Sequence, residues 1–204
     1  MFYKNYIKRI LDIVISLGAL TLLLPLFFIV SIIIKLDSEG SLIFKQLRVG
    51  KYKKEFYIYK FRTMSLDAPK EQPTSLLLNA DQYITRTGRF LRKTSLDELP
   101  QLINILKGDM SIIGPRPVIR TEIELIKQRD KNDIYNIRPG LSGWAQINGR
   151  DEVTNKEKVH YDKYYFDNIS LILDIKIFIL TVIKVLKSEG VNEGPSKELA
   201  RKSK

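Results

Sequence analysis

A run of 22 residues without a charged side chain, from Ile13 to Ile34, dominates the N-terminal part of this chain. A membrane-spanning helix needs about 20 predominantly apolar residues, so the run has the length of a membrane segment. A signal peptide would have a shorter apolar part that ends at a small-residue cleavage site. Here the run continues directly into Lys35-Leu36-Asp37. The sequence therefore predicts a membrane-embedded N-terminal region.

Pro25 lies near the middle of this run and lacks the N–H that a helix needs there, so we expect a kink or break at Leu24-Pro25. At about 1.5 Å per residue, neither half of the run crosses a hydrocarbon core of about 30 Å. Positive side chains are retained on the cytoplasmic side of a membrane. Basic residues flank both ends of the run, which favours a re-entrant segment; they are Lys4, Lys8, Arg9, Lys35, Lys45 and Arg48. A kinked spanning helix is equally compatible with these residues.

The charge of the chain restricts its partners. Lys and Arg together number 34 against 23 Asp and Glu, a net charge of +11. This excess favours phosphorylated substrates, nucleic acid or an anionic membrane surface as partners. The chain has no cysteine, which excludes disulfides, thiol catalysis and thiolate zinc sites, and its one histidine, His160, cannot form a metal cluster by itself.

The 204 residues suffice for one domain and an appendage. We divide them into a membrane segment (1–36), a main domain (37–189) and a polar tail (190–204). Alternating residues at 41–49 and 54–64 predict a β-hairpin, and residues 66–82 predict a loop or lid. Apolar residues at helical spacing predict a helix over 96–107 that begins with a capping box between Ser95 and Glu98. The predicted fold class is α+β, mainly helical.

A second apolar segment lies at 169–187. On a helical wheel one face is apolar and the opposite flank carries lysines; the apolar residues are Ile175, Phe178, Ile179, Val182 and Leu186, and the lysines are Lys176, Lys184 and Lys187. This pattern fits a helix that lies in a membrane interface with its lysines reaching toward water. It fits a core helix of the domain equally well.

Asp97 and Glu98 are the first candidates for chemistry. The N-terminus of a helix favours negative charge, so we expect both to be ionised at neutral pH. Neighbours on a helix diverge by about 100°, so the two carboxylates would have different roles. An ordinary pair of capping acids is the usual explanation of such a dipeptide. The surrounding cations favour a functional site instead: Arg86, Arg89, Arg92, Lys93 and Arg116.

Two further segments suit anionic ligands. Arg116 lies between two prolines in Gly114-Pro115-Arg116-Pro117, and this stiff backbone would present a planar cation to a phosphate or carboxylate. The loop 138–150 combines three glycines, the only tryptophan (Trp144), and an arginine at each end (Arg138 and Arg150). Such parts can bind a base and its phosphates, although the loop is neither a dinucleotide fingerprint nor a Walker loop.

At these residues the chain resembles the bacterial monotopic phosphoglycosyl transferases, known as the bacterial sugar transferase family. The resemblance covers nearly the whole chain, in order, and rests on specific motifs: Lys8-Arg9-Ile10-Leu11-Asp12, and the stretches at 59–64, 95–102, 104–111, 114–117 and 138–150. Its small size resembles the minimal members, typified by diacetylbacillosaminyl-phosphate transferases. Those members usually carry Ser-Pro at the membrane break, where this chain has Leu24-Pro25.

The resemblance implies transfer of a sugar 1-phosphate from a UDP-sugar to polyprenyl (undecaprenyl) phosphate, with release of UMP. It implies that Asp97 is the nucleophile of a covalent intermediate, that Glu98 orients or deprotonates the acceptor, and that both organise a Mg²⁺ ion. The further implied roles are substrate-phosphate binding by Arg116, Arg92 and Lys60, and nucleotide binding by Arg138, Gly140, Trp144 and Arg150. Arg9 and Asp12 could brace the base of a re-entrant helix, although Asp12 fits a helix-start residue equally well.

The implied location is the cytoplasmic face of the bacterial inner membrane, in exopolysaccharide, lipopolysaccharide or protein-glycosylation pathways. The implied partners are the donor, the lipid acceptor and membrane lipid, with no nucleic acid; a homodimer is left open. The alternative is a non-catalytic basic protein that binds membrane surfaces. That alternative explains the net charge but not why Asp97-Glu98 lies among arginines.

Overall fold

The computed structural model describes residues 2–69, 80–149 and 153–187. An apolar helix, α1 (Lys8–Asp37), follows a π-helical turn, η1 (Tyr3–Ile7). The fold contains two short sheets: β1 (Ile43–Val49) and β2 (Glu55–Phe61) form an antiparallel pair, and β3 (Ser111–Ile113) and β4 (Gly140–Ser142) form a parallel pair. The remaining α-helices are α2 (Arg86–Lys93), α3 (Gln101–Lys107), α4 (Ile123–Lys131), α5 (Trp144–Ile147), α6 (Asn155–Asp167) and α7 (Leu171–Leu186). The predicted α+β class is confirmed.

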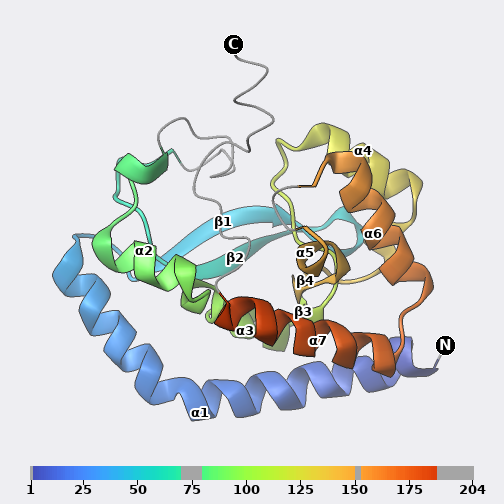
Figure 1. Cartoon of the computed structure of the whole chain (residues 1–204), viewed down its shortest axis with the longest axis horizontal. Helices are drawn as coiled ribbons and strands as arrows, with labels where there is room; N and C mark the ends of the chain where they lie inside the picture. The colour runs from blue at the N-terminus through green and yellow to red at the C-terminus, as the bar shows by residue number, and fades with distance from the viewer. Residues whose placement is uncertain (1, 70–79, 150–152, 188–204) are drawn as a thin grey trace.

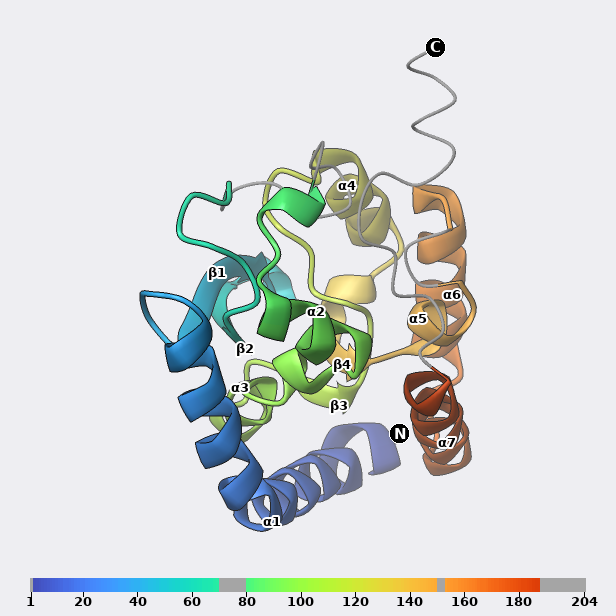
Figure 2. The ribbon, with the colours of Figure 1, turned by 60° about the vertical axis from the view of Figure 1, so that its left-hand side comes forward.

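Helix α1 continues through Pro25, so Leu24-Pro25 bends the helix and does not interrupt it. Figures 1 and 2 show two arms that meet at an angle, with the rest of the fold on the inner side. The bend is expected, because proline removes one backbone hydrogen bond and its ring collides with the preceding turn. Most of the helix surface is exposed and apolar, and the helix is long and apolar enough to cross a membrane.

Both arms of α1 contact the domain. At the first arm, Arg9 donates to the carbonyl oxygens of Ile105 (2.6 Å) and Leu106 (3.0 Å) at the end of α3. Asp12 Oδ1 accepts hydrogen bonds from the hydroxyl of Ser111 and the amide of Ile112, each at 3.0 Å. Arg9 and Asp12 therefore tie the base of α1 to the domain, as expected, while the re-entrant course of the helix stays a prediction.

The second arm is held by packing and by a buried arginine. Val30 and Ile34 are buried against Phe61 of β2 and Leu91 of α2. Arg62 is buried and donates to the backbone oxygen of Ser38 (2.6 Å), just beyond the end of α1. Because the two ends of one helix are tied to the same domain, its bend is fixed by contacts at both ends.

The hairpin is confirmed: Ile43 pairs with Phe61 and Val49 with Glu55. The helix at the C-terminal side is also confirmed, and the predicted apolar face of α7 is exposed, with Phe178 at 50% and Leu186 at 80%. The buried residues of α7 are Leu173, Asp174 and Ile177. The helix thus has one buried stripe and one exposed apolar stripe, which favours the interface interpretation over a core helix. The predicted tail and most of the predicted 66–82 loop lie outside the described residues.

Candidate active site

Asp97 and Glu98 lie in η5 (Leu96–Glu98), a single 3-10 turn between α2 and α3. The prediction of one helix over 96–107 is wrong, because α3 begins only at Gln101, after Pro100. The predicted capping box is also wrong. Ser95 has a left-handed backbone (φ 56°) and its side chain makes no capping bond. A non-glycine residue in this region is strained by about 1 kcal/mol, and such strain is often concentrated at functional sites.

Glu98 is bound by two cations instead of by a helix terminus. Its Oε1 accepts from Lys60 Nζ at 2.7 Å and from Arg116 Nη2 at 3.1 Å. Lys60 Nζ also lies 4.0 Å from Asp97 Oδ2. Asp97 and Glu98 are both buried, so neither carboxylate is an ordinary capping acid on an exposed surface. Lys60, which comes from β2, connects the two carboxylates.

Burial changes the protonation of this cluster. Desolvation raises the pKa of Asp97, and the charge of Glu98 raises it further, while Lys60, Arg92 and Arg116 oppose the rise. Desolvation also lowers the pKa of Lys60, against the attraction of Glu98. The expectation that helix position alone keeps Asp97 ionised is therefore incomplete. Its charged form depends on the neighbouring cations.

Arg92 approaches from α2. Its Nε donates to Thr63 Oγ1 at 2.9 Å, and its charge acts on Asp97. Helix α2 reaches this position because Gly88 packs directly against the backbone of Thr63. The structure therefore brings the predicted residues Asp97, Glu98, Lys60, Arg92 and Arg116 into one cluster.

We expect Gly88→Ala to destabilise the protein and to displace Arg92. A Cβ at this position would overlap the carbonyl oxygen of Thr63. Overpacking of this kind costs about 1–3 kcal/mol, which lowers Tm by roughly 3–10 °C in a chain of this size. The matched control is Gly18→Ala, where an added Cβ has no atom within 4 Å. Thermal unfolding in detergent checks this, and equal Tm values for both variants would contradict it.

Arg116 is positioned by a network that the sequence did not reveal. The amide of Gly114 donates to Ser142 O (2.8 Å), which extends the β3–β4 ladder to the Gly-Pro-Arg-Pro segment. The carbonyl of Arg116 accepts from Arg129 Nη1 at 2.8 Å. Arg129 in turn pairs with Asp162 at 2.6 Å, and both are almost fully buried. A buried ion pair linking α4 and α6 thus supports the backbone of Arg116.

Arg48, which the sequence analysis named only as a basic residue flanking the apolar run, is a further residue near this site. It lies at the end of β1 and donates to Pro117 O at 3.1 Å, beside Arg116. Burial and the charge of Arg116 lower its pKa to about 10. Nothing in the alternation of the strand distinguishes Arg48 from an exposed strand arginine. Thr63, by contrast, lies within the 59–64 motif of the family resemblance and could have been chosen from it as a candidate site residue.

The predicted nucleotide-binding residues make their recorded contacts with other parts of the fold. Arg138 Nε donates to Gly108 O (2.8 Å), at the far end of α3. Gly140 packs its backbone against Gly114, so the close approach it permits is between two strands. Trp144 stacks on Tyr164 with ring centroids 5.3 Å apart. Arg150 lies outside the described residues. The role of these residues in nucleotide binding stays a prediction.

The two carboxylates fit a Mg²⁺ site in which the substrate phosphates supply further ligands. In proteins Mg²⁺ is commonly held by one or two carboxylates together with substrate phosphates. Within residues 2–69, 80–149 and 153–187, no group of three or more histidine, aspartate or glutamate side chains could form a complete protein site. Asp97 and Glu98 could supply the protein ligands, because they are adjacent in η5 and carry the carboxylate oxygens that Mg²⁺ prefers.

Comparison with known proteins identifies the family of this chain. A family model described as "Bacterial sugar transferase" matches residues 3–188. The chain is 41% identical over 187 residues to an uncharacterized sugar transferase, EpsL, of Bacillus subtilis, covering 92% of this chain and 91% of EpsL. It is 39% identical to the exopolysaccharide production protein ExoY of Sinorhizobium fredii, covering 90% and 87% of the two chains.

The name of one longer relative states a reaction. The UDP-glucose:undecaprenyl-phosphate glucose-1-phosphate transferase of Escherichia coli is 41% identical over 188 residues, which cover 89% of this chain but only 40% of that protein. The chain thus spans less than half of this longer relative. The family model matches residues 3–188, a range that includes the apolar helix α1 and the carboxylate site. With the two relatives that match over most of both chains, it shows that this chain belongs to the bacterial sugar transferase family.

Proposed function

We propose that this protein transfers a sugar 1-phosphate from a UDP-sugar to undecaprenyl phosphate and releases UMP. The observation that carries the proposal is the cluster of two adjacent buried carboxylates with Lys60, Arg92 and Arg116 around them. Relatives named as undecaprenyl-phosphate transferases of glucose and galactose phosphates support the donor and acceptor classes. The reaction would be the first membrane step of a polysaccharide or glycoprotein glycan pathway.

In the first step, an oxygen of Asp97 attacks the sugar-linked phosphorus of the donor. The bond from that phosphorus to the bridging oxygen breaks, and UMP leaves with the electron pair. The product is an acyl phosphate between Asp97 and the sugar phosphate. In the second step, a phosphate oxygen of the lipid attacks the same phosphorus, and the Asp97 carboxylate leaves. No net proton is consumed when the lipid phosphate reacts as a dianion.

The side chains supply charge and orientation for this chemistry. A carboxylate that approaches a diphosphate is repelled, and cations must compensate this repulsion. Arg116 is best placed to bind the sugar-linked phosphate, because its carbonyl is fixed by Arg129 and its guanidinium borders Glu98. Glu98, already bound by Lys60 and Arg116, suits an orienting role better than a proton-transfer role. A Mg²⁺ ion held by Asp97 and Glu98 would supply further charge neutralisation.

We further propose that α1 is re-entrant and that the domain lies on the cytoplasmic face of the inner membrane. A straight helix of 30 residues extends about 45 Å, which would separate its ends by more than a bilayer core. Arg9 and Asp12 at one end and Ile34 at the other nevertheless contact one domain. The exposed apolar stripe of α7 would lie in the same interface.

The topology can be tested with single cysteines, because the natural chain contains none. We expect Phe2→Cys and Glu39→Cys, at exposed positions beyond either end of the apolar run, to react with a membrane-impermeant maleimide only from the cytoplasmic side. Inverted and right-side-out vesicles provide the two arms of the measurement. Labelling of Phe2→Cys from the periplasmic side alone would identify a kinked spanning helix.

The activity is tested by incubating the purified full chain with a panel of UDP-sugars and undecaprenyl phosphate. We expect UMP release that depends on both the donor and the lipid. If no donor in the panel supports lipid-dependent UMP release while vesicle binding is retained, the alternative of a non-catalytic basic membrane protein is favoured.

A further inference from the structure

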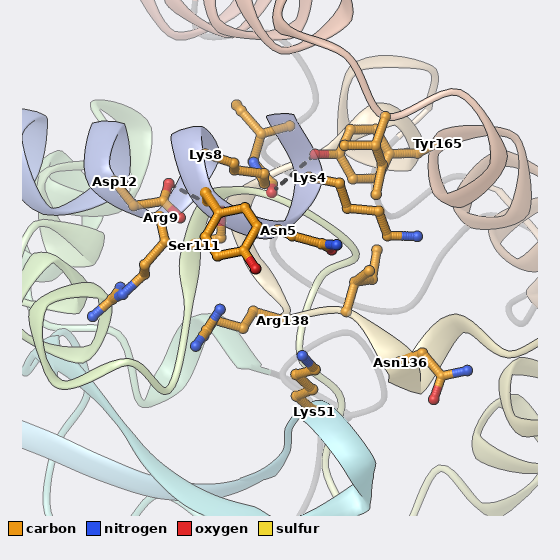
Figure 3. Close-up of a pocket in the computed structure, with 14 residues that line it drawn as sticks. Lys4, Asn5, Lys8, Arg9, Asp12, Lys51, Ser111, Asn136, Arg138 and Tyr165 are labelled. Atoms are coloured by element: carbon orange, nitrogen blue, oxygen red, sulfur yellow. Dashed lines mark hydrogen bonds between the residues drawn. The ribbon is translucent and has the colours of Figure 1, made fainter. Parts of the chain in front are cut away.

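A cavity of about 320 Å³ lies at the N-terminal base of α1, apart from the carboxylate cluster. Figure 3 shows Lys4, Lys8 and Arg9 on the α1 side, and Lys51 and Arg138 on the opposite side. Five cationic side chains thus line one cavity. Asp12 is the acidic residue among the lining residues.

The two carboxylates near this cavity, Asp12 and Asp174, already have hydrogen-bond or ion-pair partners. Asp12 accepts hydrogen bonds from Ser111 and from the amide of Ile112. Asp174, outside the lining, pairs with Lys8 at 2.7 Å and accepts hydrogen bonds from Tyr3 and Tyr165.

The other four lining cations have no carboxylate partner within ion-pair distance among residues 2–69, 80–149 and 153–187; they are Lys4, Arg9, Lys51 and Arg138. Arg9 and Arg138 donate instead to backbone carbonyls, and Lys4 and Lys51 lie over the rings of Phe166 and Tyr52. Arg9 and Arg138 also repel each other. Bringing like charges together around an open space is unfavourable unless an anion enters it.

The surroundings of the cavity are apolar and face outward. Tyr6 (62%) and Ile10 (60%) are exposed next to it on the α1 side, and Ile172 (82%) is exposed on α7. Lys8 and Tyr3 tie these two helices together through Asp174. A ligand with a phosphate and an acyl chain would match this combination of a cationic cavity and adjoining apolar helices.

We propose that this cavity binds the phosphate headgroup of an anionic phospholipid and so anchors the base of α1 in the membrane. The inference rests on the proposed position of α1 and α7 at the bilayer surface.

The bound lipid is distinct from the acceptor. Arg9 and Arg138 contact carbonyls at the C-terminal end of α3, whereas Asp97 precedes its N-terminal end. The seven residues of α3 separate the two places by about 10 Å along the helix. A phosphate in the cavity therefore cannot react at Asp97.

The test is native mass spectrometry of the full chain released from micelles that contain phosphatidylglycerol and phosphatidylcholine in equal amounts. We expect retention of phosphatidylglycerol. In Lys4→Gln/Lys51→Gln, retention should fall roughly 25-fold, since each basic residue contributes about a fivefold effect at an anionic surface. The control Lys54→Gln/Lys127→Gln removes the same charge from exposed positions outside the cavity and should retain the lipid like the wild type.

Three outcomes would overturn the proposal. The first is equal lipid retention in the cavity variant and the control. The second is displacement of phosphatidylglycerol by UMP, which would assign the cavity, with Arg138, to the nucleotide. The third is preferential retention of undecaprenyl phosphate that the cavity substitutions abolish.

Two further measurements keep the test decisive. If the double variant is misfolded, Lys51→Gln alone, with an expected loss of roughly fivefold, decides the question. UMP release is measured separately, so failure of lipid retention and failure of the transfer reaction are distinguishable.

Discussion

Asp97→Asn is expected to abolish UMP release, with a loss of at least about 1,000-fold in turnover. The amide has nearly the shape of the carboxylate but is neither charged nor nucleophilic, so the acyl phosphate cannot form. The matched control is Asp81→Asn, an exposed aspartate of the turn η4 (Ala80–Gln82) that is not among the residues of the cluster. Turnover of Asp97→Asn within tenfold of the wild type would reject Asp97 as the nucleophile.

The same variant should fold at least as well as the wild type. Burial raises the pKa of Asp97 in the folded state. A carboxyl group with a raised pKa stabilises the fold below its unfolded-state pKa, and this contribution is lost as the pH increases through the folded-state pKa. At neutral pH the buried charge of Asp97 therefore lowers the free energy of unfolding, and substitution by asparagine removes this destabilisation. An unchanged or higher Tm would separate loss of chemistry from loss of structure.

Lys60→Gln is expected to lower kcat/KM by about 100-fold and to shift the pH profile. Lys60 is the largest influence opposing the raised pKa of Asp97. Its removal raises that pKa further, so the acid limb of the kcat/KM profile should move to higher pH. The shift arises because a larger fraction of Asp97 is protonated at a given pH and cannot attack phosphorus.

The pH profile distinguishes this role from phosphate binding alone. If Lys60 only bound the donor, KM would rise and the acid limb would stay in place. The control Lys45→Gln removes an exposed lysine from the neighbouring strand, beside Tyr59, and should leave both quantities close to wild type. An acid limb that is unmoved, or that moves to lower pH, in Lys60→Gln would contradict the electrostatic role.

The elements that the sequence predicted well are those governed by local pattern. The apolar run and Pro25 predicted a bent helix, and alternation predicted the β1–β2 hairpin. The helix over 96–107 failed because apolar spacing cannot register that Pro100 and a left-handed Ser95 divide the segment. The turn that results is stabilised by Lys60 and Arg116, which are distant in sequence.

The parallel β3–β4 pair was missed because each strand has three residues, too few for a recognisable alternation. Its partners are joined by a long connection, and pairing depends on the tight contact between Gly114 and Gly140. The sequence analysis interpreted the glycines of the 138–150 loop as sites of close approach to a ligand. At Gly140 that approach is to another strand.

Some residues of the candidate site could likewise be predicted from the sequence, and others could not. Asp97, Glu98, Arg92 and Arg116 could be selected from composition and from the resemblance to a family. The Arg129–Asp162 pair and Arg48 could not, because an arginine that supports a carbonyl across the fold has no sequence signature. Only the tertiary structure connects them to Arg116.

The covalent intermediate at Asp97 is tested most directly by intact-protein mass spectrometry. The full chain is incubated with the donor that supports turnover, in the absence of undecaprenyl phosphate, and is then acid-quenched. The mechanism predicts an added mass equal to the donor minus UMP, absent in Asp97→Asn and discharged when undecaprenyl phosphate is supplied. A wild-type protein that turns over with both substrates but never gains this mass with the donor alone would contradict it.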